Sequence, residues 1–298
     1  MLRRVSRTER NPKRTVAIVG CGRLASSLAP ALAEAGYTIT EIIVRPQSRP
    51  RARVLAKKVG ARAVTMQSAA LDAALLWLSV PDREICNAAG ALAERVATLA
   101  NSGPPKIRFA FHSSGALTIR ELEPLRQLGI ASASVHPLMT FVAGAQPSLA
   151  GVPFALEGDR PATNLARRIA RDLSSESFLL SAQRKPAYHA WATMTSPLFV
   201  AYLATVEEAA RGAGLTRESA RRMSFPILRQ TLTNYAALGA AGSFSGPFIR
   251  GDVATVAEHL ALLSKYPDVR EVYLALAEAA LDRLPVKNRS QLRRLIKG

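Results

Sequence analysis

The chain has 298 residues, a formal net charge of +18 and 48% hydrophobic residues. This length predicts two domains, and this composition excludes a disordered or collagen-like chain. No window approaches roughly 18 uninterrupted apolar residues, so we expect no transmembrane helix. Cys21 and Cys86 are the only cysteines, and no histidine or cysteine cluster has a metal-ligand spacing, so we expect neither a disulfide framework nor a metal site.

The first 14 residues are basic, and they are not followed by the apolar h-region of a secretory signal. We therefore expect a flexible basic arm instead of a secretory signal, and a cytoplasmic protein. The positive charge also raises the alternative of a nucleic-acid-binding protein. Because the basic residues are spread out and lack interleaved aromatic residues, we favour an arginine-rich surface without a nucleic-acid partner.

Strand and helix signals alternate through the first half of the chain. Each strand signal is a short apolar run, and alanine- and leucine-rich helical stretches separate the runs. Such alternation predicts a parallel sheet covered by helices. The runs are residues 16–19, 41–44, 63–65, 75–80, 107–112, 132–136 and 152–156.

From residue 164 onward the pattern is helical. Pro197 and Pro226 fall inside two of the expected helices and should kink or divide them. The sequence therefore predicts an α/β Rossmann-type domain over residues 15–158 and an all-helical domain over residues 159–298. The expected helices span residues 164–173, 186–211, 216–238, 252–264, 268–284 and 289–296.

The stretch TVAIVGCGRLASSLAPALAEAGY contains a β-branched run, a G-x-G-x-x-A pattern and a helical segment, in that order. Gly20 permits a tight turn after the strand, Gly22 lets a pyrophosphate approach the backbone, and Ala25 allows close packing of the helix. The alternative is a glycine turn that only fits a crowded corner between strand and helix. We favour a dinucleotide site with contacts from Gly20, Cys21, Gly22, Arg23 and Leu24.

The end of the second strand, IIVRPQSRPRAR, indicates which dinucleotide binds. A cofactor without a 2′-phosphate needs a carboxylate about twenty residues beyond the glycines. This chain has Arg45, Ser48 and Arg49 there, and their guanidinium and hydroxyl groups suit a phosphate dianion. The stretch predicts NADP(H) as the cofactor, and the alternative is a solvated basic loop.

Further polar residues follow the later strands, at the sheet edge where ligands bind in open α/β folds. We expect Val80, Pro81 and Ser113 to form a wall of the cofactor site. Asp82 is expected only to cap the next helix.

The segments FAFHSSGAL and SVHPLMTF place Ser114, Gly115 and His136 at the ends of two strands, where we expect them to bind the substrate. A histidine beside serines also raises the alternative of a serine hydrolase. The G-x-S-x-G elbow of α/β-hydrolases is absent from the sequence, which argues against that class.

The segment QRKPAYHAWATMTSP begins a long helix, with Pro186 in its first turn. Lys185 and His189 are four residues apart and therefore share one helix face. Converging on the cofactor, they could polarise and protonate a carbonyl group as the hydride arrives, so we assign them as the catalytic pair. The alternative is an ordinary helix start with a solvated lysine.

The glycine pattern and the motifs LSVPDREI, HSSGAL, SVHPLMTF, FALEGD, KPAYHAWA and SGPFIRGDVATVAEHL together resemble a bacterial family that pairs a Rossmann-like domain with domain of unknown function 2520. That family is similar to the 6-phosphogluconate dehydrogenase-like superfamily, which includes ketopantoate reductases, pyrroline-5-carboxylate reductases and β-hydroxyacid dehydrogenases. The resemblance spans about residues 14–285. It implies a dinucleotide-binding domain, a helical domain that commonly dimerises and a substrate cleft between them. Lys185 matches the lysine of the superfamily's first long helix, and His189 replaces an asparagine.

These inferences predict an NADPH-dependent reductase of a small keto or imino acid, similar to a ketopantoate reductase. We expect Arg250 to face the substrate, and the long apolar faces of the helices beyond residue 215 predict a homodimer. Two alternatives stay open. A non-catalytic NADP(H)-binding regulator would need no proton donor, and a nucleic-acid-binding protein would show strongly salt-dependent binding.

Overall fold

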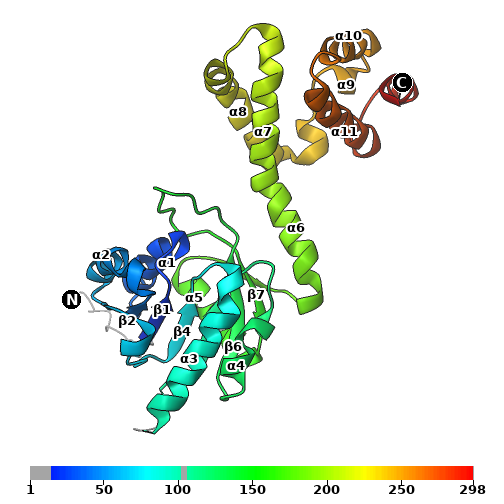
Figure 1. Cartoon of the computed structure of the whole chain (residues 1–298). Helices are drawn as coiled ribbons and strands as arrows, with labels where there is room; N and C mark the ends of the chain where they lie inside the picture. Colours follow the sequence, from blue (N-terminus) through cyan, green and yellow to red (C-terminus); the bar gives the residue numbers. More distant parts are fainter. Residues whose placement is uncertain (1–14, 102–105, 298) are drawn as a thin grey trace, which may run out of the picture. The chain divides into compact units, whose positions relative to one another are not determined.

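The computed structural model describes residues 15–101 and 106–297 (Figure 1). The basic arm predicted for residues 1–14 lies outside the described residues. Contacts divide the described chain after Ala192 into two compact units, which we call the sheet unit and the helical unit. The domain boundary predicted at residue 158 falls within the sheet unit, since helix α5 (Arg160–Asp172) follows it and packs on the sheet.

One eight-stranded sheet forms the centre of the sheet unit, in the order β3-β2-β1-β4-β5-β6-β7-β8. The strands from β3 to β6 are parallel, β7 is antiparallel to β6, and β8 is parallel to β7. The predicted Rossmann-type parallel sheet is confirmed, and β8 is an addition that the sequence did not predict. The strands are β1 (Thr15–Val19), β2 (Thr38–Ile43), β3 (Arg62–Val64), β4 (Leu75–Leu78), β5 (Phe109–His112), β6 (Ala131–Pro137), β7 (Phe154–Gly158) and β8 (Ser177–Leu179).

Successive residues of the central strands point to opposite faces of the sheet and enter two separate cores. In β4, Leu75 and Trp77 belong to one core, whereas Leu76 and Leu78 belong to the other. Helices α1, α2 and α5 cover the first core, and α3 and α4 cover the second. Besides α5, these helices are α1 (Arg23–Glu34), α2 (Arg49–Val59), α3 (Ile85–Ala100) and α4 (Glu123–Arg126).

The order of the strands determines where a ligand can bind. β1 lies between β2 and β4, so the chain winds outward in opposite directions from this point. The carboxyl ends of neighbouring parallel strands diverge there and leave a crevice, which is the usual ligand site of open α/β sheets. The glycine turn after β1 lies at this crevice.

The helical unit has a small core from three helices, α10, α11 and α12. The residues of this core are Val256, Leu260, Ala277, Leu281, Leu292 and Ile296. Ala220 is the one buried residue of the long helix α8. Helix α6 (Lys185–Thr195) begins in the sheet unit, and the remaining helices are α7 (Pro197–Ala209), α8 (Arg217–Ser243), α9 (Pro247–Arg250), α10 (Val253–Leu263), α11 (Pro267–Arg283) and α12 (Arg289–Lys297).

The two prolines expected to interrupt helices behave differently. Ser196 separates α6 from α7, and Pro197 takes the first position of α7, as the sequence predicts. Pro226, which was expected to kink or divide its helix, does not divide it, because α8 continues through this residue. The non-helical residue of α8 is Gly239 (φ 69°). Short 3₁₀ helices span Pro46–Ser48, Met66–Ser68, Asp82–Glu84, Ile119–Leu122, Ala182–Arg184 and Ala210–Ala213.

Within the described ranges, no helix combines the length and the apolar character that a membrane crossing would require.

Candidate cofactor and substrate site

The glycine turn after β1 is built on close backbone contact. Gly20 has a φ of +104°, and a Cβ atom there would lie 2.5 Å from the carbonyl oxygen of Ser79. Only glycine fits both the conformation and the space. Gly22 is the N-cap residue of α1, and a Cβ on it would meet only the Ser79 oxygen, at 3.7 Å. The backbone of Gly22 is therefore open to a ligand at the amino end of α1.

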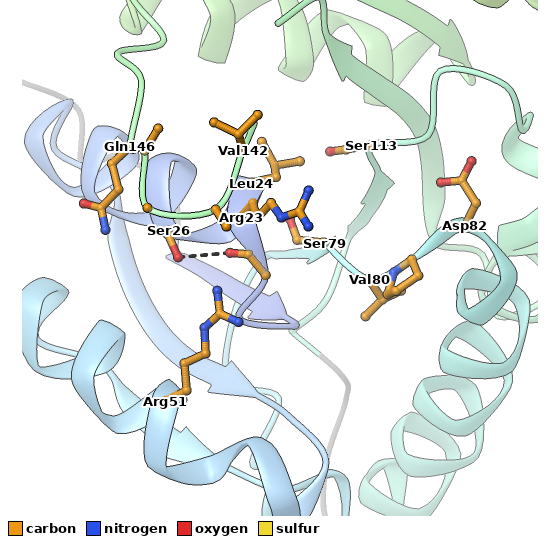
Figure 2. A pocket seen from close by; sticks show the side chains of 15 residues that line it. Arg23, Leu24, Ser26, Arg51, Ser79, Val80, Asp82, Ser113, Val142 and Gln146 are labelled. Atoms are coloured by element: carbon orange, nitrogen blue, oxygen red, sulfur yellow. Dashed lines mark hydrogen bonds between the residues drawn. The ribbon is translucent and has the colours of Figure 1, made fainter. Parts of the chain in front are cut away.

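Two adjoining cavities, of about 660 Å³ and 440 Å³, lie at the carboxyl ends of β1, β2 and β4. Both are lined by Gly22, Arg51, Ser79, Val80 and Pro81, so they form one elongated site. Figure 2 shows the guanidinium groups of Arg23 and Arg51 pointing into the larger cavity, with Ser113 and Asp82 toward its other end. The Ser79 hydroxyl is buried and lacks a hydrogen-bond partner within the described chain.

The residues predicted to contact the cofactor gather around these cavities, and Arg49 is the one that lines neither. Arg51 was not predicted, although it lines both. Arg51 belongs to the same basic stretch as Arg45 and Arg49, but the direction of its side chain depends on the rotation of α2 about its axis, which the sequence does not give. The predicted residues on the cavity walls are Gly20, Cys21, Gly22, Arg23, Leu24, Arg45, Ser48, Val80, Pro81 and Ser113.

The one carboxylate of β2, Glu41, is buried and has a structural role. Its oxygens accept hydrogen bonds from Arg62 (2.9 Å) and from the backbone N–H groups of Ala70 and Leu71 (3.0 Å each). The end of β2 instead presents Arg45 to the smaller cavity. Nearby, burial raises the pKa of the Cys21 thiol, and the positive charge of Arg51 partly opposes that effect.

The turn after β5 is fixed by hydrogen bonds around Ser114. Its hydroxyl donates to the Asp82 carboxylate (2.6 Å) and accepts from the Leu117 N–H (2.9 Å). The Ser114 N–H donates to Nδ1 of His112 (3.1 Å), while Nε2 of His112 contacts the Thr118 carbonyl (3.0 Å). Asp82 thus has a role beyond the helix cap expected from the sequence, because its carboxylate holds a residue 32 positions later.

Ser113 lies between the sheet core and the larger cavity. Its hydroxyl accepts a hydrogen bond from the Trp77 indole N–H (2.8 Å), and the residue lines the cavity. The buried Trp77 ring therefore orients a residue of the cavity wall.

Lys185, at the start of α6, is buried next to the Ser114 turn, with 2% of its surface exposed. Its ammonium group donates to the Ser114 carbonyl (3.0 Å) and to the Ser134 hydroxyl (2.5 Å). Burial lowers the pKa of Lys185 to about 8, against the opposing effect of Glu157 and Asp82. The lysine thus lies against the backbone of the Ser114 turn.

His136 and His189 meet beside Gly115. A Cβ atom on Gly115 would lie 3.0 Å from Nε2 of His136 and 3.0 Å from Cδ2 of His189. The other nitrogen of His136, Nδ1, is 2.6 Å from the Tyr188 hydroxyl. Burial and the charge of Lys185 lower the pKa of His136 to about 4, so its ring is neutral near pH 7.

The structure therefore brings together five residues that the sequence assigned to catalysis and substrate binding: Ser114, Gly115, His136, Lys185 and His189. Arg250, the sixth, lies in the helical unit, where its guanidinium group pairs with Asp252 (2.8 Å). Sequence reasoning missed Ser134 and Tyr188. Tyr188 belongs to the KPAYHAWA motif and lies about one helical turn from Lys185, and this spacing could have indicated a place near the site. The described residues contain no cluster of His, Cys, Asp and Glu suited to a metal ion.

Two family models match the chain. Residues 4–137 match the Rossmann-like domain, and residues 152–280 match the domain of unknown function 2520 (DUF2520). The chain pairs a Rossmann-like domain with a DUF2520 domain. This confirms the resemblance stated from the sequence motifs. No curated protein sequence matches the chain.

Solved structures share the fold at low sequence identity. A Bacteroides fragilis protein named as an NADP oxidoreductase is 21% identical, with a TM-score of 0.71, over 91% of this chain and 99% of that chain. A pyrroline-5-carboxylate reductase from Coxiella burnetii is 17% identical, with a TM-score of 0.57, over 95% and 98%. A reductive aminase from Aspergillus terreus, solved with NADPH and ethyl-5-oxohexanoate, is 16% identical, with a TM-score of 0.59, over 95% and 99%.

The candidate substrate residues come from both matched regions. Ser114 and His136 belong to the Rossmann-like match, whereas Lys185 and His189 belong to the DUF2520 match. The DUF2520 region therefore contributes to the sheet edge itself, through the start of α6.

Proposed function

We propose that this DUF2520 protein is an NADP(H)-dependent oxidoreductase that reduces a small keto or imino acid. The observation that carries the proposal is the elongated site at the strand switch point, where Arg45 and Arg51 occupy the position of a ribose-binding carboxylate. The names of the structurally similar proteins support the same cofactor class.

The residues present fit a dinucleotide. The turn at Gly20 excludes side chains, the backbone of Gly22 is open, and the buried Ser79 hydroxyl lacks a partner within the described residues. The amino end of α1 and Arg23 would bind the pyrophosphate. Arg45 and Ser48, which follow β2, and Arg51 of α2 would bind the 2′-phosphate. Bound in this way, the cofactor would supply the hydride in the larger cavity.

The chain's own groups would prepare the substrate for reduction. Lys185 binds the Ser114 carbonyl oxygen, which belongs to the same peptide unit as the Gly115 N–H. A cation on the oxygen of a peptide strengthens its N–H as a donor. Lys185 would therefore stabilise developing negative charge on the substrate through Gly115 as well as by its field, while His189 would supply a proton from the exposed side.

The proposal is tested by cofactor binding and a substrate panel. Calorimetry is expected to show NADPH binding at least tenfold more tightly than NADH. Arg51→Ala should weaken NADPH binding by about 1–3 kcal/mol, the worth of charged hydrogen bonds. Arg53→Ala is the matched control, since Arg53 is an exposed residue of the same helix that lines neither cavity. Equal affinity of the unmodified protein for both cofactors would contradict the NADP(H) assignment.

A second candidate is a non-catalytic NADP(H)-binding regulator. The burial of Lys185 against protein acceptors favours it, because both of these contacts of the ammonium group stabilise the fold. Saturable NADPH binding without turnover of any 2-oxo acid or cyclic imine would support the regulator. Turnover of any member of the panel would exclude it.

A further inference from the structure

The pair formed by His136 and Tyr188 lies beside the groups to which the reaction was assigned above, and its own role was not specified there. Tyr188 is buried, with 7% of its surface exposed, and its hydroxyl lies 2.6 Å from Nδ1 of His136. The two rings meet edge to face, with centroids 5.6 Å apart. Tyr188 is also held by Phe178 and Trp191, at centroid distances of 6.0 Å and 5.9 Å. The hydroxyl is therefore fixed on the histidine nitrogen.

The direction of this hydrogen bond follows from the surroundings. The described residues offer the Tyr188 hydroxyl no other acceptor, so a proton on Nδ1 would leave the phenol proton buried without a partner. Such a group is destabilising because it has lost its hydrogen bonds to water without replacing them. If the phenol donates to Nδ1, both groups are satisfied. The pKa values agree, because burial lowers that of His136 to about 4 and raises that of Tyr188 to about 12.

A neutral imidazole that accepts at Nδ1 carries its proton on Nε2. Nε2 of His136 is the atom that lies 3.0 Å from the Cβ position of Gly115, at the meeting point with His189. Within the described chain, no hydrogen-bond partner is found for this nitrogen, and it is not among the buried unsatisfied atoms. It is therefore available to a ligand.

We propose that Tyr188 is a positioning residue that fixes the proton of His136 on Nε2, so that His136 presents a permanent hydrogen-bond donor beside Gly115. A permanent donor selects ligand groups that accept, such as a carbonyl or carboxylate oxygen, over groups that only donate, such as a protonated imine. The inference depends on the proposed function for the reaction, and it narrows the ligand group beside Gly115 to an oxygen acceptor, the carbonyl or the carboxylate of the substrate. His136 keeps its proton throughout and polarises the ligand as a neutral donor.

The direct test is ¹⁵N NMR of the full chain with labelled histidine, which needs neither cofactor nor substrate. Only four histidines are present, so single His→Gln variants assign every signal. His136 is expected to show a protonated Nε2 and an unprotonated Nδ1. His112 is an internal reference of the same tautomer, because its Nδ1 accepts from the Ser114 N–H. A protonated Nδ1 on His136 in the unmodified protein would overturn the proposal.

Tyr188→Phe tests the positioning role, because it removes the hydroxyl and keeps the ring. The variant is expected to give a mixture of His136 tautomers. Tyr273→Phe is the matched control, since it breaks the corresponding contact of the Tyr273 hydroxyl with His259 (3.0 Å) in the helical unit and should leave His136 unchanged. An unchanged tautomer in a folded Tyr188→Phe variant would refute the role of Tyr188. If that variant does not fold, the spectrum of the unmodified protein still decides the tautomer.

Ligand selection is tested with two small probes of the same shape. Acetate offers only acceptors and is expected to shift the Nε2 signal of His136, whereas acetamidinium offers only donors and should not. A shift with acetamidinium alone would overturn the proposed selection of acceptors.

Once a substrate is known, His136→Gln, which keeps an N–H donor, should retain KM within about threefold, while His136→Leu should raise it about tenfold, the loss of one hydrogen bond. Failure of turnover with an intact Nε2–H tautomer would count against the proposed reaction and not against this assignment.

Discussion

The sheet unit and the helical unit bury their apolar side chains to very different extents. In the sheet unit, β4 is buried along its whole length and feeds two cores. In the helical unit, the 27-residue α8 has one buried residue. Large apolar side chains are instead exposed along α8, namely Met223, Phe225, Ile227, Leu232, Tyr235 and Leu238. An exposed apolar surface of this kind is typical of an interface, which supports the predicted homodimer.

The largest expected effect contrasts two leucines. Leu28 in α1 is fully buried, whereas Leu232 in α8 is 54% exposed. Leu28→Ala should lower the free energy of unfolding by about 2–5 kcal/mol through the cavity that it leaves. Leu232→Ala should change it by less than about 0.5 kcal/mol in the monomer. Urea unfolding at low protein concentration measures both, and equal losses would remove the contrast between the units.

Acidification should weaken the sheet unit by a comparable amount, through two buried histidines. Burial lowers the pKa values of His112 and His136 from 6.5 to about 4. The unfolded chain then binds protons more readily than the fold, so stability is full above pH 6.5 and is lost as the pH falls toward 4. Each group contributes on the order of 3 kcal/mol. Both tryptophans, Trp77 and Trp191, belong to the sheet unit, so their fluorescence reports this loss in urea titrations between pH 7 and 4.5.

A control separates this effect from general acid unfolding. His259→Gln in the helical unit should leave the pH dependence of the fluorescence transition unchanged. A stability of the sheet unit that stays constant between pH 6.5 and 4.5 would contradict the burial of neutral His112 and His136.

Substitutions of the proposed catalytic pair in the sheet unit should lower turnover without loss of the cofactor. Lys185→Met and His189→Ala are each expected to lower kcat about a hundredfold while NADPH binding stays intact, because they remove charge and proton donation from the reaction. Steady-state kinetics decide, and full activity of both the Lys185 and His189 variants would transfer the chemistry to other residues.

The smallest expected effect concerns association. Ile227→Ser and Leu238→Ser, on the exposed face of α8, should each weaken the homodimer about tenfold, or about 1.4 kcal/mol. Val54→Ser is the matched control, because Val54 is 63% exposed on α2 of the sheet unit. Light scattering over a concentration series measures the change, and a monomeric unmodified protein at micromolar concentration would refute the homodimer.

Short-range features were predictable from the sequence. The turn at Gly20 follows from a β-branched run that meets a glycine pattern, and the break at Pro197 follows from a missing N–H. β8 was missed because three residues give no measurable periodicity. Pro226 did not divide α8, because a proline removes one backbone hydrogen bond and this loss can be tolerated within a long helix. The non-helical residue of α8 is Gly239.

The sequence by itself determined the type of most elements and which polar residues follow the predicted strands, because turns and periodicity act over a few residues. Only the tertiary structure decided which of these residues meet. Lys185 contacts Ser114 across 71 positions, and Asp82 contacts Ser114 across 32. The parallel pairing of β4 and β5 causes the second contact, since it brings the carboxyl ends of these two strands to one edge. Lys185 instead reaches Ser114 from the start of α6, which follows β8. The rotation of α6 about its axis then determines that Lys185 contacts the Ser114 turn and that Tyr188 contacts His136. Local sequence preferences do not determine this rotation, because it depends on how the helix packs on the sheet unit.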